Sequence, residues 1–164
     1  MEYDFILRLF VAALLGGLIG LEREYRAKEA GFRTHFLVAL GSALFMIVSA
    51  YGFEGVMTTT EHRWDVSRVA AQVVSGIGFI GAGTIIFQRH AVRGLTTAAG
   101  LWVTAAIGMA AGAGMYLLAI ETTALVLIGL EAFNHALRHM NRRENPSKNG
   151  ENSASDADFP SNEE

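Results

Sequence analysis

Five long apolar runs divide the chain, and short polar segments separate them. Each run is about long enough to cross a hydrocarbon core roughly 30 Å thick as a helix, and the runs cover approximately residues 5–21, 36–53, 66–88, 95–111 and 115–137. This pattern predicts an all-α membrane protein, a bundle of five transmembrane helices over residues 1–137 with no soluble domain. From residue 138 the chain is polar and contains its two prolines, so we expect a disordered tail over 138–164.

The third apolar run is unusually rich in small residues. Its glycines imitate a dinucleotide-binding loop, but no polar turn separates a strand from a helix, and the next carboxylate after Gly83 is Glu121. That motif needs a strand, a helix and an acidic residue about 20 positions on. We therefore interpret the run as a helix whose small side chains share one packing face, formed by Ala71, Ser75, Gly78 and Ala82.

Small residues also recur one helical turn apart in two other runs. Gly16 and Gly20 form a G-x-x-x-G pair in the first run, and Gly108 and Gly112 continue a step of four in the fourth. Such spacing lets two helix backbones approach closely in a membrane. We expect each of these glycines to contact a neighbouring helix.

Composition and charge agree with a membrane location and set its orientation. The chain is 51% hydrophobic and only 18% charged, which is too apolar for an ordinary soluble domain. Ten of the 13 basic residues fall in the segments 22–35, 88–94 and 138–164. Because basic residues favour the cytoplasmic side, the N-terminus should lie outside and the C-terminus in the cytoplasm. Cysteine is absent, which excludes disulfides and thiolate chemistry.

A few polar residues fall inside the predicted spans, where charge is costly and usually faces protein or water. Arg8 and Arg68 either neutralise Glu121 or pair locally with Asp4 and Asp65 while reaching the headgroups. Near the inner end of the fifth span, Glu131 and His135 have three possible roles: structural capping, a proton or ion relay, and a surface that binds a partner. The candidate intramembrane residues are Arg68, Gln72, Glu121, Glu131 and His135.

Three polar segments on the predicted cytoplasmic side can assemble one charged, hydroxyl-rich site. Arginines, a histidine and helix N-terminal amides together favour an anion or a carboxylate over a cation, so no metal site is predicted. A solvated surface facing lipid headgroups is the alternative. We also expect Thr96 or Thr97 to cap the fourth helix. The candidate residues are Glu22, Arg23, Arg33, Thr34, His35, Arg93, Thr96 and Thr97.

Four motifs resemble the MgtC/SapB family of bacterial inner-membrane proteins. They are GGLIGLERE (16–24), AGFRTHFLVALGSALF (30–45), RVAAQVVSGIGFIGAGTI (68–85) and VRGLTTAAGLWVTAAIG (92–108). The resemblance implies a multi-helix domain in the bacterial inner membrane and a link to magnesium limitation. It covers the membrane part only, because MgtC-type members carry a soluble ACT-like C-terminal domain that these residues do not resemble.

Two functions follow from the residues and the resemblance. The first is a non-enzymatic protein that acts in magnesium limitation or ion homeostasis by interacting with or regulating other membrane proteins, with the bilayer, a second copy or a membrane protein as partner. The alternative is a small transporter or channel subunit for magnesium or another ion. Mg²⁺ prefers carboxylate oxygens, and the spans offer only Glu121 and Glu131. No catalytic motif, cofactor site or nucleic-acid partner is predicted.

Overall fold

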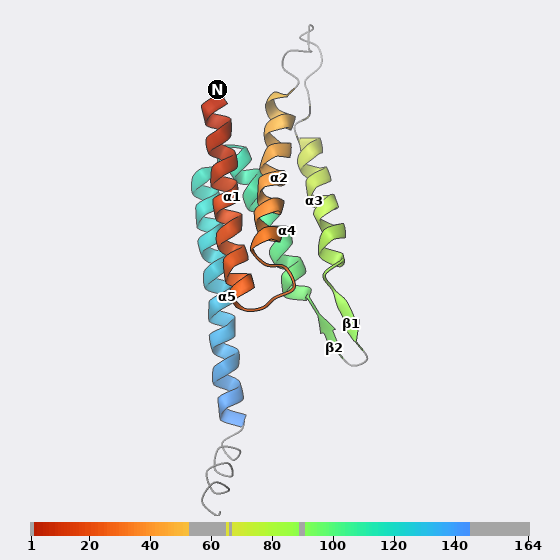
Figure 1. The fold of residues 1–164 in the computed structure, drawn as a ribbon, viewed down its shortest axis with the longest axis vertical. Helices are drawn as coiled ribbons and strands as arrows, with labels where there is room; N and C mark the ends of the chain where they lie inside the picture. Colours follow the sequence, from red (N-terminus) through yellow and green to blue (C-terminus); the bar gives the residue numbers. More distant parts are fainter. Residues whose placement is uncertain (1, 53–64, 66, 89–90, 145–164) are drawn as a thin grey trace, which may run out of the picture. The chain divides into compact units, whose positions relative to one another are not determined.

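A computed structural model of the chain describes residues 2–52, 65, 67–88 and 91–144, with side chains as far as residue 132. Contacts divide the chain into two compact units, residues 1–127 and 128–164. The first unit contains four helices, a hairpin and the beginning of a fifth helix (Figure 1). In chain order the elements are α1 (Glu2–Tyr25), α2 (Phe32–Tyr51), α3 (Ser67–Ala82), β1 (Ile86–Gln88), β2 (Ala91–Arg93), α4 (Leu95–Gly112) and α5 (Tyr116–Glu144).

Helices α1, α2 and α4 pack against one another through small residues and form the core of the first unit (Figure 1). A Cβ placed on Gly20 would lie 2.7 Å from Phe32 Cα, and one on Gly112 would lie 2.6 Å from the Ala43 carbonyl oxygen. A Cβ on Gly16 would collide with the Ala39 side chain and the His35 carbonyl oxygen, and one on Gly108 would collide with the Ala39 backbone. The glycines therefore let three helix backbones come into direct contact, which is how helices associate where lipid removes the hydrophobic driving force.

The first unit places its small side chains inside and many of its large apolar ones outside. Helix α1 buries Ala12 and Gly16 but exposes Ile6, Phe10 and Leu14, which follow one another at steps of four. A contiguous apolar surface of this kind is not stable in water. The distribution is that of a helix bundle whose outer surface faces lipid.

Three of the described helices, α1, α2 and α4, are long and apolar enough to cross a membrane. They correspond to the predicted runs 5–21, 36–53 and 95–111. Helix α3 has 16 residues, or about 24 Å at 1.5 Å per residue, against a hydrocarbon core of about 30 Å. The helical membrane bundle is confirmed to this extent, whereas the five spans and the orientation of the termini stay predictions.

The third predicted helix, 66–88, is too long in the prediction, because α3 ends at Ala82. Residues Ile86–Gln88 instead form a strand that pairs antiparallel with Ala91–Arg93. Gly94, which follows the hairpin and precedes α4, has φ +86°, and a Cβ there would collide with the Thr84 carbonyl oxygen. The chain therefore requires glycine at this position. Strand β2 falls within the basic segment 88–94 that was expected only to connect two spans.

Helix α5 starts after a turn that contains Gly114, with φ +80°, and Ala119 on its first turns joins the core formed with Ala12 and Ile107. It continues to Glu144, beyond the boundary predicted at residue 137. The rest of the predicted tail, 145–164, lies outside the described residues. The second unit comprises residues 128–164, and its described part is the C-terminal portion of α5.

Candidate functional site

The connection between α1 and α2 is a tight loop that brings polar residues from both helices together. Lys28 N donates to the Arg23 carbonyl oxygen at 3.0 Å, and Ala27 between them has φ +50°. This closes the end of α1 in the left-handed conformation common at helix C-termini. Gly31 is the N-cap of α2, without a side-chain hydrogen bond of its own.

A glutamate of α1 supplies the cap that Gly31 lacks. Glu24 Oε2 accepts a hydrogen bond from Phe32 N, the first amide of α2, at 2.8 Å. A carboxylate at a helix N-terminus also interacts favourably with the helix dipole. Glu24 therefore ties the end of one membrane helix to the start of the next.

Arg23 has the largest fully buried side chain among the described residues of the first unit, with 2% of its surface exposed. Its Nε donates to Glu22 Oε2, and Arg26 Nε donates to the other oxygen of the same carboxylate at 2.8 Å. Arg23 Nη2 is buried without a hydrogen-bond partner among the described residues. One carboxylate thus holds two guanidinium groups, one of them inside the protein.

His35 lies beside this pair and is fully buried. Its Nδ1 is 3.0 Å from the Gly31 carbonyl oxygen, so Nδ1 carries the proton and Nε2 is an acceptor in the neutral ring. Nε2 is also buried without a partner in the described part of the chain. Gly100 of α4 leaves room for the ring, because a Cβ there would lie 3.5 Å from Nε2.

Helix α4 contributes one more polar contact, one turn before Gly100. Thr97 is buried, and its hydroxyl donates to Glu29 Oε2 at 2.6 Å. The expected role of Thr97 as a cap is wrong, because Gly94 is the N-cap and the hydroxyl binds the loop. The bond from Thr97 lowers the pKa of Glu29, and the neighbouring positive charges of Lys28 and Arg93 act in the same direction. Thr97 lies in the first turn of α4, and the dipole at this N-terminus also favours an ionised carboxylate beside it.

We call the residues of these contacts the Arg23 cluster, which joins α1, α2 and α4 at the end where the α1–α2 loop lies. It consists of Glu22, Arg23, Glu29, His35 and Thr97. Of the eight predicted cytoplasmic-face residues, it contains four. Arg33, Arg93 and Thr96 are exposed, and Thr34 is half-buried. Glu24 and Glu29 were not predicted, since nothing in the local sequence shows that their carboxylates reach the next helix or α4.

The predicted intramembrane residues of the first unit are not part of this cluster. Arg68 is exposed and pairs with Asp65 at 3.5 Å, as the local alternative expected. Gln72 is exposed on α3 and lines an apolar groove between α2 and α3. Glu121 and Glu131 are each exposed on α5, and the side chain of His135 lies outside the described ones.

Arg8 joins the elements of the first unit at the opposite end of α1. It forms an ion pair with Asp4 at 2.7 Å and donates to the carbonyl oxygen of Gly112 at 3.0 Å and to the hydroxyl of Tyr51 at 3.3 Å. These contacts satisfy the charge inside protein. Arg8 therefore fixes the end of α4 to α1 and α2.

The predicted packing residues separate into two groups. Gly16, Gly20, Gly108 and Gly112 all lie against a neighbouring helix. Ala71, Ser75, Gly78 and Ala82 are exposed along α3, and a Cβ on Gly78 would meet nothing within 4 Å. The first group packs the chain against itself, whereas the second group is exposed.

The Arg23 cluster suits oxygen acceptors and water better than a metal. Its unsatisfied nitrogens are one guanidinium donor and one imidazole acceptor, and two carboxylates already bind donors. In the described part of the chain, no three His, Asp or Glu side chains are grouped as metal ligands. A bundle of apolar helices packed through glycine, with a buried ion pair at one end, defines an integral membrane protein.

Comparison with known proteins places the chain in a family. The model of the MgtC family matches residues 9–139, and the chain belongs to that family. No solved structure matches.

Three relatives illustrate the similarity. The chain is 53% identical over 143 residues to the "Putative magnesium transporter YhiD" of Escherichia coli K12, with 87% of this chain and 66% of the relative covered. It is 43% identical over 142 residues to "Protein MgtC" of Salmonella typhimurium LT2, covering 87% and 58%. It is 43% identical over 139 residues to "Uncharacterized protein slr0014" of Synechocystis, covering 84% and 54%. The chain thus spans about half to two thirds of the length of these relatives.

Proposed function

We propose that this protein acts in the bacterial inner membrane during magnesium limitation, or in ion homeostasis more generally, by binding and regulating other membrane proteins. The observation that carries this proposal is the solid core of α1, α2 and α4. Gly16, Gly108 and Gly112 bring the helix backbones into contact. Such packing leaves the centre of the bundle filled by protein rather than by an ion path.

The placement of the acidic residues supports regulation over transport by a single copy. Mg²⁺ keeps several waters and binds through one or two carboxylates, so a path for it needs acidic oxygens inside the bundle. Glu121 and Glu131 are exposed on α5 instead. The first unit instead buries the guanidinium of Arg23, which pairs with Glu22. A positive charge at this place repels a cation.

The exposed small-residue face of α3 supports a partner in the membrane. Another helix can approach this face closely, because its side chains are small. The face consists of Ala71, Ser75, Gly78 and Ala82. Two partners fit this description, a second copy of the chain and a different membrane protein. Enzymatic activity is not proposed, because the sequence contains no catalytic motif and no cysteine.

We propose five spans with the N-terminus outside and the C-terminus in the cytoplasm. The distribution of basic residues supports this orientation, and it places the Arg23 cluster at the cytoplasmic end. In this arrangement α3 crosses together with its hairpin segment, since the helix alone is shorter than the hydrocarbon core.

A second candidate function is a subunit of a transporter or channel for magnesium or another ion. The printed name of the Escherichia coli relative, a putative magnesium transporter, favours it. An oligomer could bring Glu121 from several copies around one path, which a single chain cannot do. Mg²⁺ is substrate rather than cofactor in this alternative.

Reconstitution separates the two functions. The purified chain is placed in liposomes loaded with a magnesium-sensitive dye, beside Glu121→Gln and empty liposomes. We expect no flux above that of empty liposomes, and a membrane protein that co-purifies in mild detergent and is lost in Gly78→Leu. Magnesium flux that Glu121→Gln abolishes would establish the transporter and reject the regulatory proposal.

A further inference from the structure

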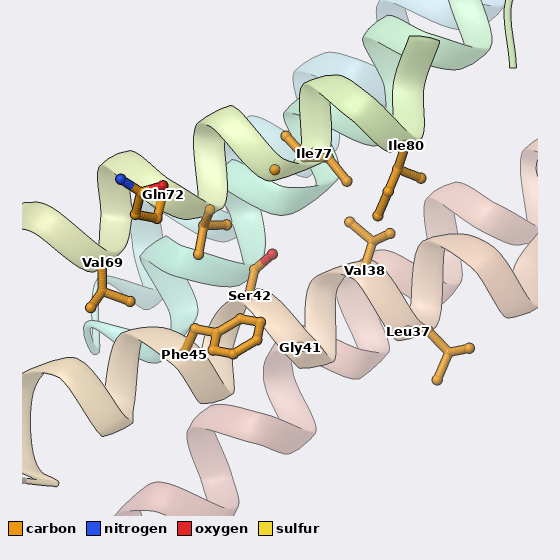
Figure 2. Close-up of a pocket in the computed structure, with 11 residues that line it drawn as sticks. Leu37, Val38, Gly41, Ser42, Phe45, Val69, Gln72, Ile77 and Ile80 are labelled. Carbon is orange, nitrogen blue, oxygen red and sulfur yellow. The ribbon is translucent and has the colours of Figure 1, made fainter. Parts of the chain in front are cut away.

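An apolar groove of about 550 Å³ runs between α2 and α3 (Figure 2). Its volume lies within the range of about 300–1,000 Å³ typical of small-molecule sites. On the α2 side it is lined by Leu37, Val38 and Phe45, and on the α3 side by Val69, Ile77 and Ile80. The only polar side chains in the lining are Ser42 and Gln72. The lining of the groove is therefore suited to a hydrocarbon chain.

Glycine on both walls gives the groove its width. Gly41 of α2 and Gly76 of α3 line it, and a Cβ on either residue would meet nothing within 4 Å. The floor is closed where Ile77 packs with Leu101 and Ala105 of α4. Helix α3 packs mainly on α4 and only weakly on α2, which leaves the groove open between α2 and α3.

One end of the groove carries a positive charge. Val69 and Gln72 line this end of the groove (Figure 2). Arg68 precedes Val69 in sequence and lies one helical turn before Gln72. The Arg68 side chain is 85% exposed, and its ion pair with Asp65 is long and exposed. Such a pair is weak, so the guanidinium can bind a phosphate, for which its fork of donors is suited.

We propose that the groove binds one acyl chain of an anionic phospholipid, with the phosphate on Arg68. The apolar lining accounts for the chain, and the charge at its end accounts for the headgroup. A phospholipid has both parts joined at the required place, whereas a second copy of α3 would bring its own Arg68 toward this one. This inference does not depend on whether the protein regulates or transports.

The test measures lipid retention by the full-length protein. The chain is purified in mild detergent and titrated with phosphatidylglycerol and, separately, phosphatidylcholine, and bound lipids are counted by native mass spectrometry. The wild-type protein should retain one phosphatidylglycerol and bind it about fivefold more tightly than phosphatidylcholine, the gain expected from one basic side chain near a lipid phosphate.

Two kinds of variant identify the site. Gly76→Leu fills the groove and should weaken both lipids roughly tenfold or more. Gly78→Leu is the matched control for lipid binding, because Gly78 is equally open on the same helix but does not line the groove. It should bind lipid as the wild type does, although the same substitution is expected to remove the membrane-protein partner. Arg68→Gln should bring phosphatidylglycerol to the level of phosphatidylcholine. Gly41→Leu fills the opposite wall and replaces Gly76→Leu if that variant loses helicity.

Three results would overturn the proposal. The first is unchanged binding in Gly76→Leu and Gly41→Leu, which means that the retained lipid lies elsewhere. The second is equal loss in Gly78→Leu. The third is a lipid-free dimer that Gly76→Leu converts to monomer, which assigns the groove to a second copy.

Discussion

At the scale of single residues, the Arg23 cluster contains a buried charge that depends on one partner. A guanidinium that is 2% exposed has lost its hydration, and Glu22 is the carboxylate that compensates for the loss. Removing one partner of a buried pair leaves the other charge uncompensated. The cluster is thus a place where a small chemical change has a large effect.

Glu22→Gln should lower the free energy of unfolding by about 3 kcal/mol, measured by thermal unfolding in detergent. The amide keeps the shape of the side chain but no longer balances Arg23, which stays buried. Asp65→Asn is the control, because it removes the charge from the exposed Arg68 pair and should leave the melting temperature unchanged. Equal shifts in the two variants would show that burial does not set the strength of these pairs.

The contact between Thr97 and Glu29 makes a second prediction, and it depends on pH. Thr97→Val removes the 2.6 Å hydrogen bond to the carboxylate and should cost about 1 kcal/mol at pH 7, a value reduced for the exposure of Glu29. Thr96→Val, one residue earlier and exposed, should cost nothing measurable.

The direction of the pH effect follows from the lowered pKa of Glu29. A lowered pKa in the folded state stabilises the protein above the unfolded value, about 4.3 for glutamate, and this contribution is lost as pH falls through the folded pKa. The difference between wild type and Thr97→Val should therefore be constant above about pH 5 and shrink below pH 4. A difference that grows on acidification would contradict the assigned bond.

At the scale of helices and strands, backbone contacts at glycine hold the first unit together. Gly112 of α4 touches Ala43 of α2, whereas Gly41 of α2 faces open space. Both residues are helical glycines, so alanine should favour the helix at either position. Only at Gly112 does the added methyl group force two helices apart.

Gly112→Ala should destabilise the protein by roughly 1–3 kcal/mol, the usual cost of overpacking, and Gly41→Ala should be neutral or stabilise it by up to about 1 kcal/mol. Melting temperatures in the same detergent compare the two. If both alanines act alike, helix propensity rather than the contact with Ala43 decides stability.

The apolar runs were sufficient to predict α1, α2 and α4, because a span is defined by length and hydrophobicity alone. They were not sufficient for α3. Hydropathy continues unbroken to Phe87, but the run of β-branched and aromatic residues from Thr84 favours a strand. Gly94, after the second strand, permits the left-handed conformation that leads into α4. A hydropathy pattern cannot show that such a change from helix to strand occurs inside an apolar segment.

The candidate site was predicted in part for a similar reason. Segments ending on one side of a membrane must meet, so Arg23, His35 and Thr97 could be grouped from topology. Glu24 and Glu29 could not, because their contacts depend on the left-handed conformation at Ala27, which the sequence does not indicate. The same limit applies to α3, where spacing predicted the small-residue face but not that it is exposed.

At the scale of the whole molecule, orientation determines which compartment the Arg23 cluster faces. The absence of cysteine allows labelling at single introduced thiols without background. Lys28 is exposed in the α1–α2 loop and Tyr3 is exposed near the start of α1, so neither substitution disturbs packing. These two positions lie at opposite ends of α1, which has 24 residues and is therefore about 36 Å long.

In intact cells, a membrane-impermeant maleimide should label Tyr3→Cys and leave Lys28→Cys unmodified until the membrane is opened. This pattern follows from the N-terminus lying outside and from the basic residues of the α1–α2 loop remaining in the cytoplasm. Labelling of both positions after permeabilisation is the control for reactivity. The reverse pattern would place the Arg23 cluster on the outer side. It would then face the medium in which magnesium is limiting, and the partner would have to be sought there.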